Sequence, residues 1–171
     1  MLCFAYGSNM SLARLRARVP SAQFVDVGTL AAHRLAFHKV GYKDGSGKCD
    51  AHFTGYPEDN VIGVVFDVVD AEKSDLDEIE GLWAGYDEKE IEVVTSHGRI
   101  LTAQMYFATK IDPSLKPYHW YKKHVLVGAR ENSLPLPYIA QIEAVESEHD
   151  PDRERHERES AMYRRSTLYI V

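Results

Sequence analysis

Cysteine and long apolar runs are scarce in this chain of 171 residues, which contains only Cys3 and Cys49. Two isolated thiols do not form a disulfide framework, so we expect both to stay free in a reducing compartment. No apolar stretch approaches the roughly 20 residues that span a bilayer. The N-terminus also lacks the basic and long apolar regions of a signal peptide. These absences predict a cytoplasmic protein that does not use a membrane as a partner.

Basic residues are also fewer than acidic residues. The chain has 20 Lys and Arg residues against 26 Asp and Glu residues, a formal net charge of -6, and the basic residues are scattered along it. A protein that binds nucleic acid usually carries a clustered basic surface. We therefore expect no nucleic acid partner. The length predicts a single domain over residues 1–171, with a charged tail from about residue 149.

Three familiar catalytic patterns are missing. Segment 41–48 (GYKDGSGK) resembles a phosphate-binding loop, but its spacing is too long and Cys49 follows where Ser or Thr is required. None of the eight histidines forms the i, i+4 pair of a zinc helix or lies near a cysteine pair. Ser8 lies in a Tyr-Gly-Ser-Asn turn rather than in a Gly-x-Ser-x-Gly elbow. We expect a connection between strands at 41–48, no metal and no cofactor.

The sequence does contain a series of short runs rich in β-branched and aromatic residues, which are typical of strands. Strands are expected at residues 2–6, 25–30, 33–38, 51–55, 61–69, 90–95 and 100–107. The pair His97-Gly98 indicates a hairpin turn between the last two. Helices are interspersed with these strands but do not alternate with them regularly. The pattern therefore predicts an α+β fold rather than a doubly wound parallel sheet.

Capping residues place the expected helices. Helices are expected at residues 11–19, 70–80, 117–128 and 138–146. Ser11 and Asp70 are the expected N-caps, and Pro117 is the expected first residue of its helix. The highly charged segment 149–165 is typical of a solvated helix or a frayed arm. The apolar segment 168–171 predicts either a last strand or a contact with a partner.

Glu80 is the acid–base candidate that the helical pattern itself indicates. Leu76, Ile79 and Trp83 form one apolar stripe of the expected helix. Glu80 falls at the edge of that stripe, just before the Gly81 that we expect to end the helix. A carboxylate that faces partly inward, at the negative end of a helix dipole, has a raised pKa and acts better as base and acid near neutrality. The pattern alone leaves open that Glu80 simply reaches solvent past Trp83.

Four segments, in this order, carry a family resemblance: FAYGSN (4–9), GVVFDV (63–68), LDEIEG (76–81) and YKKHVLVGARENSLPLPY (121–138). Together they resemble the γ-glutamylcyclotransferase family of the AIG2-like superfamily, on the branch that includes the animal enzymes. The match runs from about residue 2 to about residue 146. The resemblance implies a small mixed β-barrel with helices packed around it. It also implies an enzyme that converts a γ-glutamyl amino acid or amine to 5-oxoproline and the free amine.

The resemblance further implies which residues do this. The catalytic carboxylate falls on Glu80, and a binding tyrosine falls on Tyr121. The substrate-binding stretch falls on Cys3, Phe4, Ala5, Tyr6, Gly7, Ser8 and Asn9. A further pocket tyrosine would fall on Tyr86, but one extra residue between Gly85 and Ile91 leaves that pairing open. The family implies no metal and no cofactor, and its animal branch implies a homodimer.

The implied reaction is an internal attack by the α-amine of the glutamyl group on its own γ-carbonyl, which explains the missing triad and the missing metal. The protein must hold the substrate curled, move protons and stabilise an oxyanion. Glu80 suits the proton transfers. The backbone N–H groups of the Gly7 turn suit either the oxyanion or the substrate α-carboxylate, and this choice stays open.

Two alternative functions also stay open. The first is a γ-glutamylamine cyclotransferase, or an enzyme of the same superfamily that removes a γ-glutamyl protecting group. The pocket beyond the scissile bond, which we expect loops 42–50 and 82–88 to line, decides between these substrates. Glutathione is the less expected direct substrate, because that activity belongs to a more distant branch. The second alternative is a non-catalytic module that binds γ-glutamyl ligands, since a fold does not determine a function.

Overall fold

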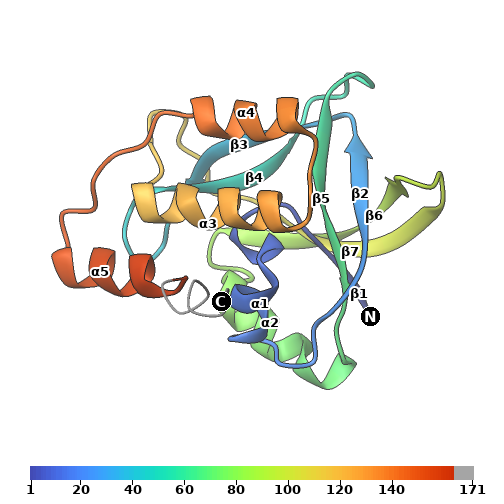
Figure 1. Ribbon diagram of the computed structural model, residues 1–171, viewed down its shortest axis with the longest axis horizontal. Helices are drawn as coiled ribbons and strands as arrows, with labels where there is room; N and C mark the ends of the chain where they lie inside the picture. Colours follow the sequence, from blue (N-terminus) through green and yellow to red (C-terminus); the bar gives the residue numbers. More distant parts are fainter. Residues whose placement is uncertain (164–171) are drawn as a thin grey trace, which may run out of the picture.

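Five strands close into a β-barrel in the computed structural model, which describes residues 1–163 (Figure 1). Around the barrel they run in the order β1 (Leu2–Ala5), β5 (Asn60–Asp67), β2 (Gln23–Ala31), β6 (Tyr86–Thr95) and β7 (Ile100–Ala108). The closing pair, β1 with β7, is parallel, whereas the other pairs are antiparallel. A separate two-stranded sheet joins β3 (His33–Val40) to β4 (Gly47–Phe53). The expected mixed β-barrel and the α+β class are confirmed.

Strand β5 is the best-buried strand of the barrel. It pairs with β1 on one side and with β2 on the other, and Val64, Val65 and Phe66 are fully buried. Gly63 lets β1 pass close to it, because a Cβ there would lie 2.5 Å from the Ala5 carbonyl oxygen. A side chain at that position would therefore push apart the strand that leads into the first turn.

The helices surround the barrel and the small sheet. They are α1 (Leu12–Arg16), α2 (Lys73–Glu80), α3 (His119–Glu131), α4 (Leu136–Ala144) and α5 (Arg153–Ala161), with 3₁₀ turns at Ser8–Met10 and Asp70–Glu72. Helices α3 and α4 lie side by side, and α5 packs against α3 on the side of the molecule away from β2 and β6 (Figure 1). No helix of the described chain is both long and apolar enough to cross a membrane.

Helix α3 and the first 3₁₀ turn touch across a glycine. A Cβ at Gly128 would lie 2.6 Å from the Met10 Cβ and 2.6 Å from the Ser11 backbone nitrogen. Helix α3 runs past Gly128 to Glu131, beyond the end expected at residue 128. It begins at His119 rather than at Pro117. This close approach fixes the turn that follows β1 against the helix that carries Tyr121.

The structure also tests the expected helix caps, strand bounds and hairpin turn. Ser11 is the N-cap residue of α1 as expected, but its side chain makes no capping bond. Asp70 begins a 3₁₀ turn, and the N-cap residue of α2 is Glu72. Strand β4 begins at Gly47 rather than at residue 51, since the Gly47 N–H bonds to the Lys116 carbonyl (2.9 Å) and the strand pairs with β3 from there. The hairpin turn at Gly98, with a φ of 75°, is confirmed.

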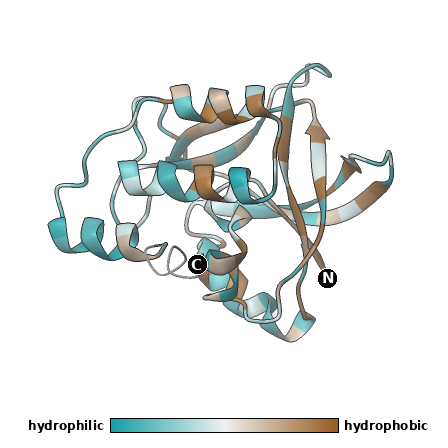
Figure 2. Ribbon diagram, viewed as in Figure 1, coloured by the Kyte–Doolittle hydropathy of each residue, from teal (hydrophilic) through white to brown (hydrophobic). Residues whose placement is uncertain are grey.

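The charged tail forms a helix rather than a frayed arm. Helix α5 is mostly hydrophilic, in contrast to the long hydrophobic stretches of the barrel strands (Figure 2). The Asp152 side chain caps it by accepting a hydrogen bond from the Arg155 N–H (3.0 Å). Segment 168–171, expected as a strand or partner contact, lies outside the described residues.

Candidate active site

A small inner cavity of about 50 Å³ opens where the turn after β1 meets the end of α2, strand β4 and helix α3. All nine residues to which the resemblance assigned a role line it: Cys3, Phe4, Ala5, Tyr6, Gly7, Ser8, Asn9, Glu80 and Tyr121. Tyr86, whose place was left open, lines it as well. The structure therefore brings together residues from four separate parts of the chain.

Glu80 is the last residue of α2. Gly81 ends the helix as expected, in the left-handed conformation with a φ of 72°. The Glu80 side chain is partly buried against the inner cavity, and its carboxylate accepts a hydrogen bond from the Asn9 amide. Burial raises the pKa of Glu80, and the nearby charges of Arg18 and Lys39 only partly oppose this. The expected direction of the shift is confirmed.

The apolar stripe that led to Glu80 is only partly correct. Leu76 is buried, but Ile79 is exposed and Trp83 is 80% exposed. The reason is that α2 ends at Glu80, so Trp83 lies beyond the helix, in a turn where its own φ is 67°. Leu76 is the one residue of α2 that is buried against the core. Glu80 turns inward because of its partners at the turn after β1.

Asn9 links Glu80 to a cation. Its amide nitrogen donates to the Glu80 carboxylate, and its amide oxygen accepts from Arg18 Nη1 at 2.8 Å. Because each end of the amide has a partner of the right polarity, the Asn9 side chain is held in one orientation. The chain of contacts from Arg18 through Asn9 therefore aims the Glu80 carboxylate and favours its ionised form.

Tyr121 and Tyr86 both bond to the backbone of Cys49. The Cys49 N–H donates to the Tyr121 hydroxyl (3.0 Å), and the Tyr86 hydroxyl donates to the Cys49 carbonyl (2.6 Å). The two hydroxyls are therefore left with opposite capacities. Tyr121 keeps its own hydrogen to donate into the cavity, whereas Tyr86 keeps lone pairs to accept.

Helix α2 is fastened to the barrel by residues that the sequence patterns did not single out. The Tyr106 hydroxyl on β7 donates to Asp77 Oδ1 (2.5 Å), and Lys73 also bonds to that carboxylate. The Tyr6 hydroxyl in turn donates to the Tyr106 carbonyl (2.6 Å). Asp77 lies three residues before Glu80, so this network fixes the helix end that carries the carboxylate. Tyrosines are common in cores, and nothing in their spacing marked Tyr106.

The turn after β1 offers backbone donors to the cavity. Among the hydrogen bonds of residues 1–163, the N–H groups of Gly7, Ser8 and Asn9 have no protein acceptor. All three residues line the inner cavity. Successive N–H groups of this kind form a small concavity that suits an anionic oxygen.

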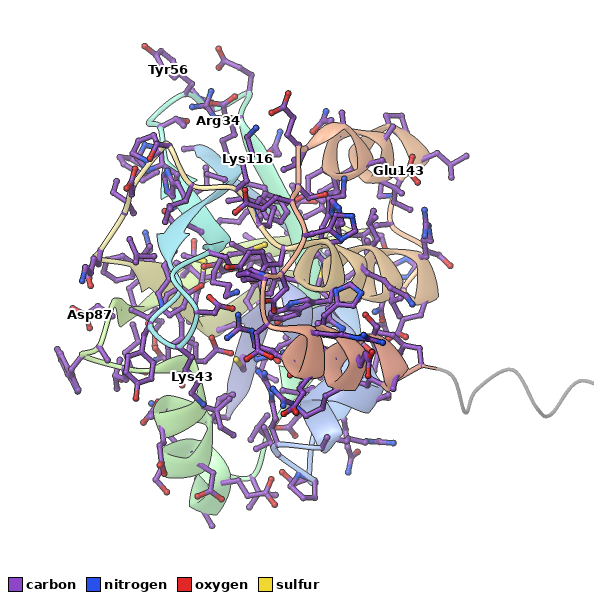
Figure 3. The ribbon with its side chains drawn as sticks, turned by 90° about the vertical axis from the view of Figure 1, so that its left-hand side faces the viewer. Arg34, Lys43, Tyr56, Asp87, Lys116 and Glu143 are labelled. Atoms are coloured by element: carbon purple, nitrogen blue, oxygen red, sulfur yellow. The ribbon has the colours of Figure 1, made fainter. Side chains whose placement is uncertain are left out.

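A second, wider cavity of about 400 Å³ adjoins the first and shares with it Ser8, Glu80, Tyr86 and Tyr121. We call it the outer cavity. Its described lining includes four carboxylates and seven cationic side chains, and the cations are Arg14, Arg18, Lys39, Lys43, Lys48, Arg155 and Arg158. Lys43 stands on the loop between β3 and β4 (Figure 3). Two loops were expected to line this cavity. Loop 42–50 lines it as predicted, whereas loop 82–88 contributes only Tyr86 to the lining.

Helix α5 forms one wall of the outer cavity, which the charge pattern of the tail could not show. Glu159 on α5 contacts Arg14 Nη1 and His124 Nε2, each at 3.2 Å. Arg14 and His124 are both buried. A buried arginine and histidine need polar partners, so the charged helix is held against the body of the protein through Glu159.

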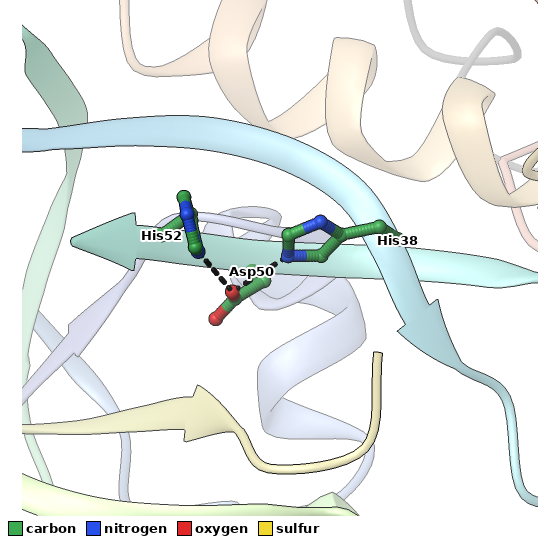
Figure 4. Close-up of side chains that lie close together, drawn as sticks. All are labelled: His38, Asp50 and His52. Carbon is green, nitrogen blue, oxygen red and sulfur yellow. Dashed lines mark hydrogen bonds and ion pairs between the residues drawn. The ribbon is translucent and has the colours of Figure 1, made fainter. Parts of the chain in front are cut away.

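His38, Asp50 and His52 form a cluster of potential metal ligands (Figure 4), and none of them lines either cavity. Asp50 Oδ2 is 2.9 Å from His38 Nε2 and 3.9 Å from His52 Nδ1. The other oxygen, Asp50 Oδ1, accepts a hydrogen bond from the Ala108 N–H (2.8 Å) and thereby ties β4 to β7. Asp50 follows Cys49 on β4, so the two side chains point to opposite faces of the strand. Histidine spacing within helices could not reveal a group built across two strands.

Fold and site together define the class: a small mixed barrel with flanking helices, whose first turn faces one carboxylate. The AIG2-like family matches residues 60–142. Human γ-glutamylcyclotransferase is 36% identical over 153 residues, which cover 85% of this chain and 78% of the human protein. The mouse γ-glutamylcyclotransferase is 37% identical over the same shares.

A solved structure of a γ-glutamyl cyclotransferase shares the fold closely. It superposes with a TM-score of 0.83 at 32% identity, covering 93% of this chain and 97% of that chain. The chain belongs to the γ-glutamylcyclotransferase family, which is a family of enzymes. The resemblance inferred from the four sequence segments is therefore confirmed.

Proposed function

We propose that this protein is a γ-glutamyl cyclotransferase, which converts a γ-glutamyl amino acid to 5-oxoproline and the free amino acid. One observation carries the proposal. Among residues 1–163, Glu80 is the one carboxylate that lines the inner cavity, and it faces the turn formed by Gly7, Ser8 and Asn9. Family membership supports it, since the human and mouse relatives carry that name.

The reaction closes a ring within the substrate. The α-amine nitrogen forms a bond to the γ-carbonyl carbon, and the amide bond between that carbon and the leaving nitrogen breaks. The substrate α-ammonium first loses one proton, and the resulting amine nitrogen loses a second proton as the ring closes. The leaving nitrogen gains two protons and departs as an ammonium, so no water is consumed. Holding the two reacting groups together is worth roughly 7–11 kcal/mol in well-oriented intramolecular reactions. A narrow cavity suits a substrate that must stay curled.

Glu80 supplies the proton transfers. In its ionised form it takes the proton from the attacking amine, and it then passes a proton to the leaving nitrogen. A carboxylate with an ordinary pKa is a weak base near neutrality, and burial raises the pKa of Glu80 toward the useful range. Asn9 keeps the carboxylate aimed during both transfers.

The turn and the tyrosines bind the glutamyl group. The free N–H groups of Gly7, Ser8 and Asn9 supply donors for its negatively charged oxygens. Tyr121 adds a hydroxyl donor, and Tyr86 adds an acceptor that suits the substrate ammonium. The proposal thus gives each polar group of the glutamyl moiety a partner of matching polarity.

A nucleophile from the protein is not part of this proposal. Burial raises the pKa of Cys3 and of Cys49 to about 12, so both thiols stay protonated and unreactive near neutral pH. The Ser8 hydroxyl has no histidine partner among the described hydrogen bonds. These features agree with a substrate that carries its own nucleophile.

The test is product analysis with purified protein. We expect γ-glutamyl-alanine to yield equal amounts of 5-oxoproline and alanine, measured by mass spectrometry. The isomer α-glutamyl-alanine is the matched control, because its amide lies on the α-carbonyl, where attack by its own amine would require a three-membered ring, and it should release no alanine. Tight binding of 5-oxoproline without turnover of any γ-glutamyl compound would instead identify a ligand-binding module.

A further inference from the structure

Most cations of the outer cavity already have acidic partners. Lys48 lies 2.7 Å from Asp44, and Arg155 lies 2.5 Å from Asp150. Arg14 pairs with Glu159. These pairs hold the walls of the cavity together. Their charges are largely neutralised, so they do not by themselves call for a ligand.

Lys39 is different. It is only 4% exposed, and its side chain lines the outer cavity with Nζ 4.4 Å from the centre of the Tyr86 ring. No carboxylate of the described chain lies within ion-pair distance of it. Lysine is almost never this deeply buried unless it is paired. A largely buried lysine without an acidic partner, whose side chain lines a cavity, therefore points to an anion that arrives with the ligand.

Arg18 is a second cation without an acidic partner. Among the described residues, the only hydrogen-bond acceptor of its side chain is the neutral Asn9 amide oxygen. Arg18 and Lys39 line the outer cavity together with Glu80, and their charges oppose the raised pKa of that carboxyl group. Glu80 can offset at most one of them, and it offsets neither while it carries the transferred proton.

The leaving part of the substrate must therefore bring the missing negative charge. A simple amino acid brings one carboxylate, which is enough for one of the two cations. The outer cavity, at about 400 Å³ against about 50 Å³ for the inner one, has room for a longer leaving group. The exposed Lys43 adds positive charge to the same cavity.

Resting on the proposed function, we infer that the outer cavity is a subsite for a dicarboxylic leaving group, bound by Lys39 and Arg18. The preferred substrates are then γ-glutamyl conjugates of acidic amino acids. A leaving group with an added ammonium, such as the side chain of lysine, would meet the same two cations and be repelled. The charge thus also argues against the γ-glutamylamine alternative.

An isosteric pair of substrates tests this inference. γ-Glutamyl-glutamate and γ-glutamyl-glutamine differ only in the second carboxylate, so the ratio of their kcat/KM values reports its recognition. We expect a ratio of about ten or more at low ionic strength, because a hydrogen bond to a charged group contributes about 1.5–3 kcal/mol. The ratio should fall as salt is added, and γ-glutamyl-lysine should be the poorest substrate of the set.

Two variants test whether Lys39 recognises the second carboxylate. Lys39→Met should bring the ratio close to one, and the exposed Lys123→Met, which removes the same charge from outside both cavities, should leave the ratio unchanged. Because both substrates are measured on one preparation, a loss of folded protein cancels in the ratio. Equal kcat/KM values for the wild type, or a ratio that Lys39→Met does not change, would overturn the inference. Absence of 5-oxoproline from every substrate would instead overturn the proposed function.

Discussion

The inner and outer cavities share four residues but differ in almost everything else. The inner cavity is narrow, is lined by tyrosines and a turn of the backbone, and contains one carboxylate. The outer cavity is wide and dominated by cations, several of them supplied by the loop after β3 and by α5. The inner one suits a fixed chemical step on a constant glutamyl group. The outer one suits the variable part of the substrate.

This difference shows how the fold separates the chemical step from the choice of substrate. Most of the inner residues come from β1, its following turn and α2, and the contacts of Tyr106 with Tyr6 and Asp77 tie these segments to the barrel. Among the outer residues, Arg14, Lys48 and Arg155 are held in place by ion pairs. Changes in the inner cavity should therefore affect the rate for every substrate, whereas changes in the outer cavity should affect the ranking of substrates.

The largest effect is expected from Glu80→Gln. This change removes the base and the acid while keeping the size of the side chain, so kcat should fall by about 10²–10⁴ for all γ-glutamyl substrates alike. The measurement is 5-oxoproline release in steady state. Asp75→Asn is the matched control, because Asp75 lies on the same helix, is exposed and lines neither cavity. Near-normal activity in the Glu80 variant would remove Glu80 from the reaction.

Tyr121→Phe should give a smaller effect, mainly on binding. The change deletes the hydroxyl that can donate to the substrate and leaves the Cys49 N–H without its acceptor. A lost hydrogen bond of about 0.5–1.5 kcal/mol corresponds to a rise in KM of about two- to tenfold. The exposed Tyr56 provides the control variant, Tyr56→Phe. A KM that stays at the wild-type value would mean that Tyr121 only supports β4.

The acid limb of the pH–rate profile should shift in Asn9→Ala. Activity requires ionised Glu80 and should be lost as the pH falls through its pKa, which burial raises above the ordinary value. The Asn9 amide favours the ionised form, so its removal should raise the pKa further and move the limb to higher pH. The measurement is kcat/KM against pH for both proteins. A limb that stays in place, or moves to lower pH, would contradict the assignment.

The smallest effect on catalysis is expected from Glu159→Gln in the outer wall. The contact with His124, with the Arg14 charge, lowers the pKa of Glu159 to about 2. A depressed carboxyl pKa stabilises the fold above the unfolded value, near 4.3, and that stability is lost as the pH falls toward 2.

The Glu159 variant should therefore unfold more easily at pH 7, by about 1–2 kcal/mol, and should lose less additional stability between about pH 4.5 and pH 2. Denaturant unfolding at several pH values measures both quantities. The turnover of γ-glutamyl-alanine should change little, in contrast to Glu80→Gln. A large loss of turnover with unchanged stability would place Glu159 inside the reaction rather than in the wall.

Much of the inner cavity was predictable, because its parts are local. The turn at Gly7 follows a short apolar strand, and Gly81 marks the helix end that carries Glu80. The resemblance then joined these parts with Tyr121. What could not be predicted is how they are held, since the contacts of Tyr106 with Asp77 and of Asn9 with Glu80 join segments that are far apart in the sequence.

The outer cavity was mostly beyond the reach of sequence patterns. Nothing in the sequence distinguishes Lys39 from an exposed strand lysine, although packing buries it. The charge pattern of the tail predicts a solvated segment, although Glu159 pairs with Arg14. Burial and pairing are properties of tertiary structure, whereas charge patterns along the chain report only its composition. The single-domain organisation, the cytoplasmic location and the homodimer stay predictions.

The central claim is that the substrate, and not water or the protein, supplies the nucleophile in the inner cavity. Turnover of γ-glutamyl-alanine in water enriched in ¹⁸O, followed by mass spectrometry of the products, tests it most directly. The account predicts 5-oxoproline and alanine with no ¹⁸O in either product. Glutamate carrying one ¹⁸O atom would show attack by water and would contradict the account.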